Sequence, residues 1–243
     1  MLVTHLDRNY LPFGKLYLLS AAKNAPDERV YVSAANLTTA EVGRLQTYNR
    51  KAIIVNHVIS IPEEIRYRQY MQCRISKVLV EAHDKFGQHG ELCIATNVDM
   101  LIRKPMSELY SLIKDKDILL LMDKEHLVAN EILNEVMVLD FDSPVMSAFL
   151  TAYNKMWDNG VVYRDDQRQL YKVFNELTDV NFGKLPLDYT DRFMQPESHI
   201  WSARRHNRFY NYNKFLSELG LPEEKTCTNL SWIGKSDGRK EAN

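Results

Sequence analysis

Residues 29–61 read RVYVSAANLTTAEVGRLQTYNRKAIIVNHVISI, and this stretch decides the predicted fold. Arg29–Ser33 alternates along the chain and is rich in β-branched side chains, which is typical of a strand. Thr38, followed three residues later by Glu41, predicts a helix that starts with a capping box. Ala52–Ile61 is a second strand-like run. A strand, a helix and a strand in close succession favour parallel strands joined by a crossover helix.

The same alternation continues on both sides of this stretch. Met1–His5 predicts a first strand and Phe13–Ala22 predicts a helix. Because a proline loses no hydrogen bond at the first helical position, we expect Pro62 to open the longest helix, which Gly87 and Gly90 end. Further strands are expected at Glu91–Thr96, Asp117–Met122 and Val136–Leu139, further helices after Pro105 and at Pro144–Trp157 and Asp165–Leu177, and irregular structure over 183–212. The pattern predicts one α/β domain, with a mostly parallel central sheet and helices on both faces.

The composition is that of an ordinary globular protein. The 243 residues are 45% hydrophobic and 26% charged, which is enough apolar surface to offset the entropy of the unfolded chain. Lys and Arg number 31 and Asp and Glu number 32, so the formal net charge is −1. A protein that coats nucleic acid needs an excess of positive charge, so no nucleic-acid partner is expected.

The cysteine pattern and the first ten residues indicate in which cellular compartment the protein is expected. Three cysteines without a CxxC pair (Cys73, Cys93 and Cys227) predict neither a disulfide framework nor a cysteine zinc site. The opening MLVTHLDRNY lacks the pattern of a signal peptide, and no run approaches the ~18 apolar residues of a membrane span. We therefore expect a cytoplasmic enzyme or binding protein without a membrane span.

Three polar clusters follow predicted strands, at Thr4–Tyr10, at Asn97–Asp99 and around Asn134. In open α/β sheets, ligands bind beyond the carboxyl ends of the strands. Asn97 and Asp99 alternate on an extended segment, so their oxygens point the same way and suit a hard divalent cation that could bind a diphosphate. The alternative interpretation is a loop in which both side chains satisfy turn hydrogen bonds.

The acidic and histidine motifs also have two interpretations each. The run Asp165-Asp166-Gln167 either presents a carboxylate to the anomeric carbon of a sugar or complements the dipole of a predicted helix. His199, with Arg204 and Arg205 after it, suits metal or phosphate capture. The alternative is a structural histidine followed by solvated arginines.

Aromatic and basic residues add three candidates. Tyr10 either stacks on a nucleobase or belongs to the core. Arg74 and Lys77 flank the apolar stripe of the predicted long helix. They either contact phosphates or are ordinary surface charges.

In their order along the chain, these motifs resemble the nucleotide-sugar glycosyltransferases of the GT-A fold, in particular the retaining galactosyltransferase group around glycogenin. The resemblance covers roughly residues 1–210. It implies a single GT-A-like, Rossmann-like domain over 1–212, followed over 213–243 by a C-terminal helix and a polar frayed tail.

The resemblance assigns donor-binding and catalytic roles. VTHLDRNY is similar to the family's first strand and loop, which places Thr4, Asp7 and Tyr10 around the base and ribose. RDDQRQL is similar to the motif that opens a helix facing the sugar, so Asp166 and Gln167 are the expected catalytic residues. The family's basic residue on the long helix is best matched by Lys77, and LNEVMVLD is similar to the strand whose Asn contacts the donor sugar. The other residues expected to bind the nucleotide-sugar are therefore Arg74, Lys77, Asn97, Val98, Asn134, Asp165 and Arg205.

The resemblance also implies a metal site for Mn²⁺ or Mg²⁺. IATNVDMLIRKP is similar to the family's D-x-D segment, so Asp99 binds the ion and Asn97 stands in place of the first Asp. SHIWSARR is similar to the late H-x-x-G-x-x-K motif, which makes His199 the second ligand and puts Arg205 on the diphosphate. Three residues depart from the family pattern: Asn97, which removes one negative charge, Ser202, which replaces a Gly, and Glu135, which replaces a small residue.

The implied activity is transfer of a hexose from a nucleoside-diphosphate sugar, with UDP as the expected nucleotide, to a hydroxyl of a glycan acceptor. Asp166 would deprotonate the acceptor in an inverting enzyme and stabilise or bond to the sugar in a retaining one, and the resemblance favours retention. Two alternatives remain. A nucleotidyltransferase would favour a Gly-rich basic loop, which HLDRNYLPFG lacks. A catalytically impaired nucleotide-sugar or carbohydrate-binding protein is favoured by Asn97.

Overall fold

The computed structural model describes residues 1–62, 65–87, 90–122, 132–158, 165–191, 195–202 and 214–218, apart from the side chains of Arg68 and Leu133. The strands are β1 (Leu2–Asp7), β2 (Val30–Ala35), β3 (Ile53–His57), β4 (Leu92–Thr96), β5 (Met100–Ile102), β6 (Ile118–Met122), β7 (Ile132–Asp140), β8 (Phe182–Lys184) and β9 (Ile200–Ser202). The helices are α1 (Leu11–Asn24), α2 (Thr39–Tyr48), α3 (Tyr67–Cys73), α4 (Ile75–Phe86), α5 (Leu109–Leu112), α6 (Met146–Asn154) and α7 (Asp165–Glu176), with 3-10 turns η1 (Arg8–Tyr10), η3 (Lys155–Trp157) and η4 (Leu187–Thr190).

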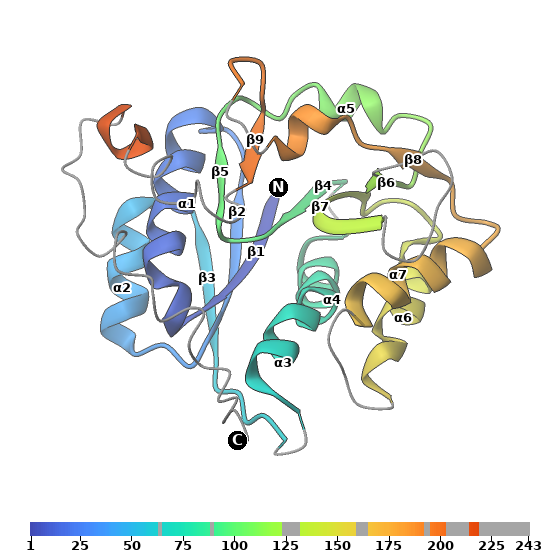
Figure 1. Ribbon diagram of the computed structural model, residues 1–243, viewed down its shortest axis with the longest axis horizontal. Coiled ribbons are helices and arrows are strands. Elements are labelled where there is room, and N and C mark those ends of the chain that lie inside the picture. Colours follow the sequence, from blue (N-terminus) through green and yellow to red (C-terminus); the bar gives the residue numbers. More distant parts are fainter. Residues whose placement is uncertain are drawn as a thin grey trace, which may run out of the picture.

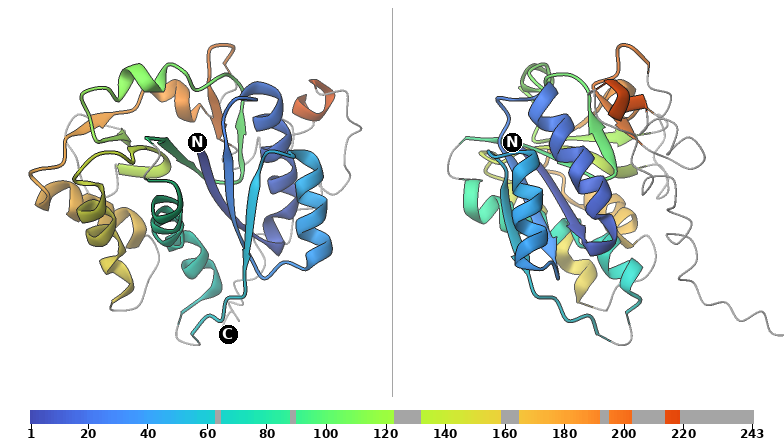
Figure 2. Two further views of the ribbon diagram at one scale, coloured as in Figure 1. Left: turned by 180° about the vertical axis from the view of Figure 1, so that it is seen from behind. Right: turned by 90° about the vertical axis from the view of Figure 1, so that its left-hand side faces the viewer.

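The central sheet confirms the predicted α/β class. Seven strands lie in the order β3-β2-β1-β4-β7-β6-β8, and every neighbouring pair is parallel except the two that β7 makes (Figure 1). Helices cover both faces, with α1 and α2 on one side and α4, α6 and α7 on the other (Figure 2). Two large buried clusters, one on each face, hold the layers together by removing apolar side chains from water.

The stretch over 29–61 folds as predicted. β2 and β3 are parallel, and α2 joins them. The Thr38 side chain accepts the N–H of Glu41, and the Glu41 carboxylate accepts the N–H of Thr38 at 2.7 Å, so the capping box is complete. The local signal and the tertiary structure agree at this point, as minimal frustration requires.

The antiparallel strand β7 brings its amino end to the edge where β1 and β4 end. Thr96, at the end of β4, pairs with Val136. On the other side of β7 the register with β6 shifts, since Leu120 pairs with Met137 but Leu121 pairs with Leu133. The residues between, 134–136, therefore bulge away from β6. Bulges of this kind redirect side chains and are common beside functional sites.

The prediction of one long helix opened by Pro62 is wrong. Arg66 is still extended, with ψ of 135°, and α3 begins at Tyr67. A turn at Arg74 separates α3 from α4, so the predicted helix is two shorter ones. The backbone carbonyl of Pro62 instead accepts the N–H of Ile65 at 3.0 Å. Proline at a helix start is a permissive signal only, because a turn also accepts its fixed φ.

Beyond the main sheet, β5 and β9 form a two-stranded antiparallel ladder beside α1 (Figure 1). β8 from Gly183 onward, together with η4 and β9, lies within the region 183–212 predicted to be irregular, where the sequence gives these elements no clear periodic signal. Among the described residues, no helix is both long and apolar enough to cross a membrane.

Candidate functional site

The loop after β1 is organised around the Asp7 carboxylate. Asp7 caps η1, and its Oδ1 accepts the N–H of Tyr10 at 3.1 Å. Its Oδ2 accepts a hydrogen bond from the hydroxyl of Tyr67, at the first position of α3. Asp7 is only 1% exposed. Asp7 and Tyr10 are therefore neighbours, as expected, and the structure adds Tyr67, whose sequence context carries no signal of this role.

Thr4 faces the sheet interior. It is fully buried, and its hydroxyl donates to the carbonyl of Thr96 at 2.8 Å. Tyr17 shares a 2.7 Å hydrogen bond with the Thr96 hydroxyl. The structure therefore gives Thr4 a structural contact between β1 and β4, and it does not place its side chain at the sheet edge beside Asp7.

A buried arginine lies behind this loop. Arg74 is 3% exposed, and one guanidinium nitrogen, Nη2, donates to Ser33 Oγ on β2 at 2.8 Å. Ser33 in turn donates to the Glu81 carboxylate at 2.8 Å. Burial lowers the pKa of Arg74, and Glu81 opposes that shift. Among the described residues, the second nitrogen, Nη1, is buried without a hydrogen-bond partner. A buried, positively charged nitrogen that lacks a hydrogen-bond partner suits the binding of an anionic ligand.

Lys77 makes different contacts from Arg74. Its ammonium lies 3.8 Å from the ring centroid of Trp157 and 5.6 Å from that of Tyr70, so it is held by cation–π attraction. Burial lowers the pKa of Lys77, and the nearby Arg74 guanidinium lowers it further. Of the two expected basic contacts, Arg74 is the one with a buried nitrogen that has no hydrogen-bond partner among the described residues.

The Asn97–Asp99 segment forms a turn that leads from β4 into β5. Its start is fixed by Asn97, whose N–H donates to the carbonyl of Glu135 at 3.1 Å. Its end is closed by Met100, whose N–H donates to the carbonyl of Asn97 at 3.3 Å. Val98 is buried, whereas Asn97 and Asp99 are partly exposed. The turn brings these two polar residues to the same edge as the amino end of β7.

A buried hydrogen-bonded pair joins β7 and α7. Asn134, in the β7 bulge, donates from Nδ2 to Asp166 Oδ2 at 2.5 Å, and both side chains are buried. Burial raises the pKa of Asp166, while this hydrogen bond and the N–H of Gln167 oppose the rise. Tyr153 on α6 is buried nearby, and burial raises its pKa well above the usual value. The predicted sugar-facing residues Asn134 and Asp166 are thus brought together.

The amino end of α7 has an unexpected acceptor. The backbone N–H groups of Asp165 and Asp166 hydrogen-bond to the sulfur of Cys73, the last residue of α3. Burial raises the pKa of this thiol to about 12, so it stays neutral. Asp165 itself lies 3.5 Å from Arg168. A small buried cysteine gives no sequence signal for this contact, because its ordinary role is core packing.

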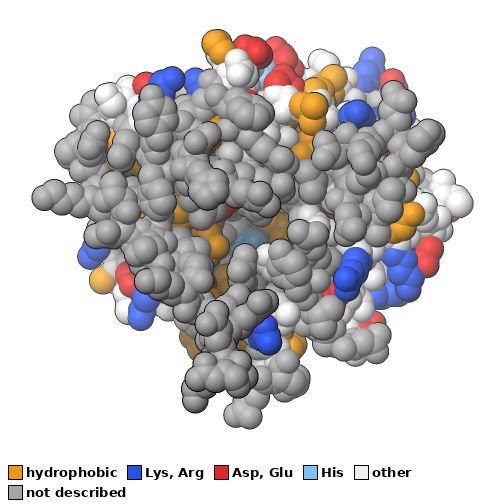
Figure 3. Space-filling model, in the orientation of Figure 1, with side chains coloured by type: hydrophobic (Ala, Val, Ile, Leu, Met, Phe, Trp, Pro, Cys, Tyr) orange, Lys and Arg blue, Asp and Glu red, His pale blue; other side chains and the backbone are white. Residues whose placement is uncertain are grey.

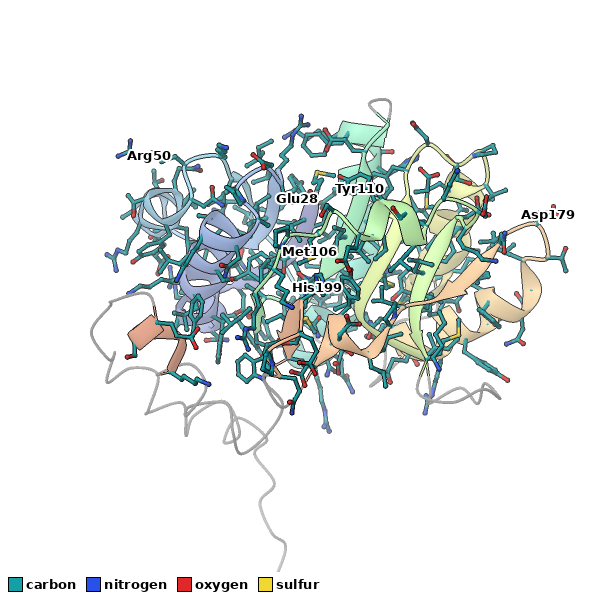
Figure 4. The ribbon with its side chains drawn as sticks, turned by 90° about the horizontal axis from the view of Figure 1, so that it is seen from above. Glu28, Arg50, Met106, Tyr110, Asp179 and His199 are labelled. Atoms are coloured by element: carbon teal, nitrogen blue, oxygen red, sulfur yellow. The ribbon has the colours of Figure 1, made fainter. Side chains whose placement is uncertain are left out.

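His199 lies against the start of α5. Its Nδ1 is 3.1 Å from the carbonyl of Pro105, and its Nε2 is 3.4 Å from a carboxylate oxygen of Glu108. Its ring stacks on Tyr189 with the centroids 4.6 Å apart. Figure 4 shows His199 beside Met106, in agreement with the contact to the preceding proline.

The β5–β9 register shows how far His199 is from Asp99. It pairs Met100 with Ser202, Leu101 with Trp201 and Ile102 with Ile200. His199 consequently lies opposite Arg103, whose N–H donates to the His199 carbonyl at 2.8 Å. Asp99 lies at the other end of the ladder, about 13 Å along the strand at ~3.3 Å per residue. The imidazole faces Glu108, beyond Arg103. The structure does not bring the two expected metal ligands together.

The donor set for a cation is therefore smaller than expected. Among the described residues, no group of three or more His, Cys, Asp and Glu side chains could hold a metal ion. Asp99 and Asn97 offer one carboxylate and one amide oxygen, which suit Mg²⁺ or Mn²⁺. His199 does not fit as their co-ligand. The metal roles of Asp99 and Asn97 stay predictions.

Three further residues complete the inventory. Arg205 lies outside the described residues. Ser202 is buried opposite Met100, which makes it the β9 residue nearest to Asp99 in the register. Glu135 is 7% exposed, so the departure from a small residue buries a carboxylate next to Asn134 in the chain. In the space-filling view, acidic side chains gather at the edge of the molecule above β5 and β9 (Figure 3).

Solved structures provide the comparison for this arrangement. The chain superposes on the apo form of WbbM, a bifunctional glycosyltransferase, with TM-score 0.63 and 11% identity, covering 93% of this chain and 50% of that one. GlyE, a glycosyltransferase of Streptococcus pneumoniae TIGR4, gives TM-score 0.63 and 11% identity, with coverage of 97% and 63%. The galactosyltransferase LgtC, solved with donor and acceptor sugar analogues, gives 0.59 and 12%, with coverage of 91% and 97%.

These likenesses show the fold. The chain has the GT-A fold of these glycosyltransferases, and it spans half the length of the WbbM chain and nearly all of the LgtC chain. No model of a known protein family matches the sequence. No curated protein matches it either.

Proposed function

We propose that the chain is a glycosyltransferase that moves a hexose from a nucleoside-diphosphate sugar, expected to be a UDP-sugar, to a hydroxyl of a glycan acceptor. The observation that carries the proposal is the buried Asn134–Asp166 pair, 2.5 Å apart, at the edge where β4 ends and β7 begins. A buried carboxylate held by an amide at this edge of a GT-A fold suits a reacting sugar. The glycosyltransferase structures that share the fold support the same class of reaction.

The reaction requires negative charge to be stabilised on the departing diphosphate. The bond between the anomeric carbon and the diphosphate oxygen breaks, and a bond to the acceptor oxygen forms. Arg74 supports this step, because its buried guanidinium has a donor with no partner among the described residues. We assign Asp99 and Asn97 to a Mn²⁺ or Mg²⁺ ion that, when bound, would neutralise the same charge.

Asp166 is proposed to act on the sugar or the acceptor. In a retaining reaction its carboxylate stabilises the positively charged sugar or bonds to it, and in an inverting reaction it takes the proton of the acceptor hydroxyl. Asn134 and the N–H of Gln167 hold that carboxylate in place. The family resemblance favours retention.

Replacing Asp166 tests this role. Asp166→Asn keeps the shape of the side chain and removes its charge, so turnover should fall about 10²- to 10⁴-fold while donor affinity stays within about threefold. Donor consumption and calorimetric binding measure the two quantities. Asp179→Asn is the matched control, because Asp179 is exposed and lies at the far side of the molecule in Figure 4.

The variant also separates the alternatives. An Asp166→Asn protein that turns over donor within tenfold of the native protein would remove Asp166 from the mechanism. A native protein that binds donor and never releases nucleotide would instead be the nucleotide-sugar-binding protein that Asn97 favours.

A further inference from the structure

Tyr67 lies at this sheet edge, and the proposed function does not yet give it a role. It opens α3, far in sequence from β1, yet its hydroxyl donates to Asp7 Oδ2. The other oxygen of Asp7 accepts the N–H of Tyr10. One buried carboxylate therefore fixes two tyrosines from different parts of the chain at the same point.

The rings of Tyr67 and Tyr10 are both partly accessible to solvent and are both held by contacts within the protein. Tyr67 is 42% exposed, and Tyr10 is partly buried against Phe13, with ring centroids 5.6 Å apart. Both residues contact Asp7, Tyr67 through its hydroxyl and Tyr10 through its backbone N–H. A ring whose hydroxyl is already hydrogen-bonded loses little conformational freedom when it binds a flat ligand.

Charges of both signs lie near Tyr67. The Asp7 carboxylate accepts the hydrogen bond of its hydroxyl, and the Arg74 guanidinium is close enough to oppose the rise in its pKa. A nucleoside diphosphate can use both groups, because its base and ribose offer hydrogen-bond donors and its phosphates are anionic. Tyr67 is thus close to a group that suits the nucleoside and to a group that suits the diphosphate.

We propose that Tyr67 is a nucleoside-binding residue, whose ring forms, together with that of Tyr10, the aromatic surface on which the donor's base stacks. The inference rests on the proposed function, because it takes the nucleotide of the same donor at the same sheet edge. It assigns the Asp7 contact a purpose, which is to hold the Tyr67 ring in a fixed orientation before the nucleotide arrives.

Calorimetric titration of UDP, with ADP, GDP, CDP and TDP alongside, tests this assignment on the full chain. Tyr67→Leu keeps apolar bulk without an aromatic face, so affinity for the best nucleotide should fall about tenfold or more. Tyr67→Phe keeps the face and should stay within about threefold. Tyr110→Leu is the matched control, because Tyr110 is 50% exposed on α5 and should bind like the native protein.

The possible results are distinct. If native protein binds a nucleotide and Tyr67→Leu binds it equally well, the assignment of Tyr67 is wrong and the proposed function stands. If Tyr67→Phe is as weak as Tyr67→Leu, the hydroxyl rather than the ring carries the affinity, and stacking is again wrong. If native protein binds none of the five nucleotides, the proposed function fails together with this inference.

Discussion

Asp166 and Arg74 are ionisable side chains that are buried, and burying each of them costs free energy. Asp166 keeps a carboxylate 7% exposed, held by Asn134, and Arg74 keeps a guanidinium 3% exposed, held by Ser33. Buried ionised groups are costly unless paired and hydrogen-bonded. Their persistence at one sheet edge is what a binding site for a charged ligand requires.

His5 makes this argument testable through pH. Its imidazole is partly buried on β1, with Nε2 2.8 Å from the carbonyl oxygen of Met71. Burial lowers its pKa to about 4, and the charge of Arg74 adds to the effect. The folded protein therefore resists protonation that the unfolded chain accepts at pH 6.5, so stability is full above pH 6.5 and falls as the pH drops toward 4.

Urea unfolding at pH 7 and pH 4.5 measures the effect. We expect the native protein to lose about 2–3 kcal/mol more between these pH values than His5→Gln, at ~1.4 kcal/mol per pH unit. Asp166 has a raised pKa and acts in the opposite direction, but it is present in both proteins. Equal losses in the two proteins would show that His5 does not titrate in this way.

At the scale of elements, the register of β5 against β9 determines which residues can share a ligand. The ladder pairs Met100, the residue after Asp99, with Ser202, and it puts His199 opposite Arg103. Sequence spacing alone could not give this, because His199 comes 100 residues after Asp99. The pairing of two three-residue strands decides it.

Two substitutions distinguish the ends of the ladder. Asp99→Ala should abolish the enhancement of UDP binding by Mn²⁺, because it removes the carboxylate assigned to the ion. His199→Ala should retain that enhancement within about threefold and lower stability by about 1–2 kcal/mol, through the lost contacts to Tyr189 and Pro105. Calorimetry with and without Mn²⁺ measures the first effect and urea unfolding the second. Loss of the enhancement in His199→Ala would contradict the register argument.

The elements also show what sequence reasoning can reach. The capping box at Thr38 is local chemistry and was predictable. The break between α3 and α4 was not, because Arg74 keeps nearly helical angles, with φ of −61° and ψ of −23°, and leaves no mark in the apolar pattern. The bulge at 134–136 was equally hidden, since it appears only when β7 lies between β4 and β6.

At the scale of the whole molecule, the sheet order explains why distant motifs meet. β1 and β4 are parallel neighbours, so their polar ends lie at one edge, and antiparallel β7 returns its amino end to that edge. The polar clusters that follow the predicted strands indicated a common edge for Asp7, Asn97 and Asn134. They could not predict contacts between side chains that the fold alone brings together, such as Tyr67 with Asp7 or the Cys73 sulfur with the start of α7.

The central claim is that this sheet edge transfers sugar from a nucleoside diphosphate. The most direct measurement is a screen of UDP-, GDP-, ADP-, CDP- and TDP-sugars with native protein and Mn²⁺, in which release of free nucleoside diphosphate is followed over time. The account predicts that at least one of these sugars is consumed, and that Asp166→Asn consumes it at least about 10²-fold more slowly. If the folded native protein releases no nucleotide from any of them, the account is contradicted.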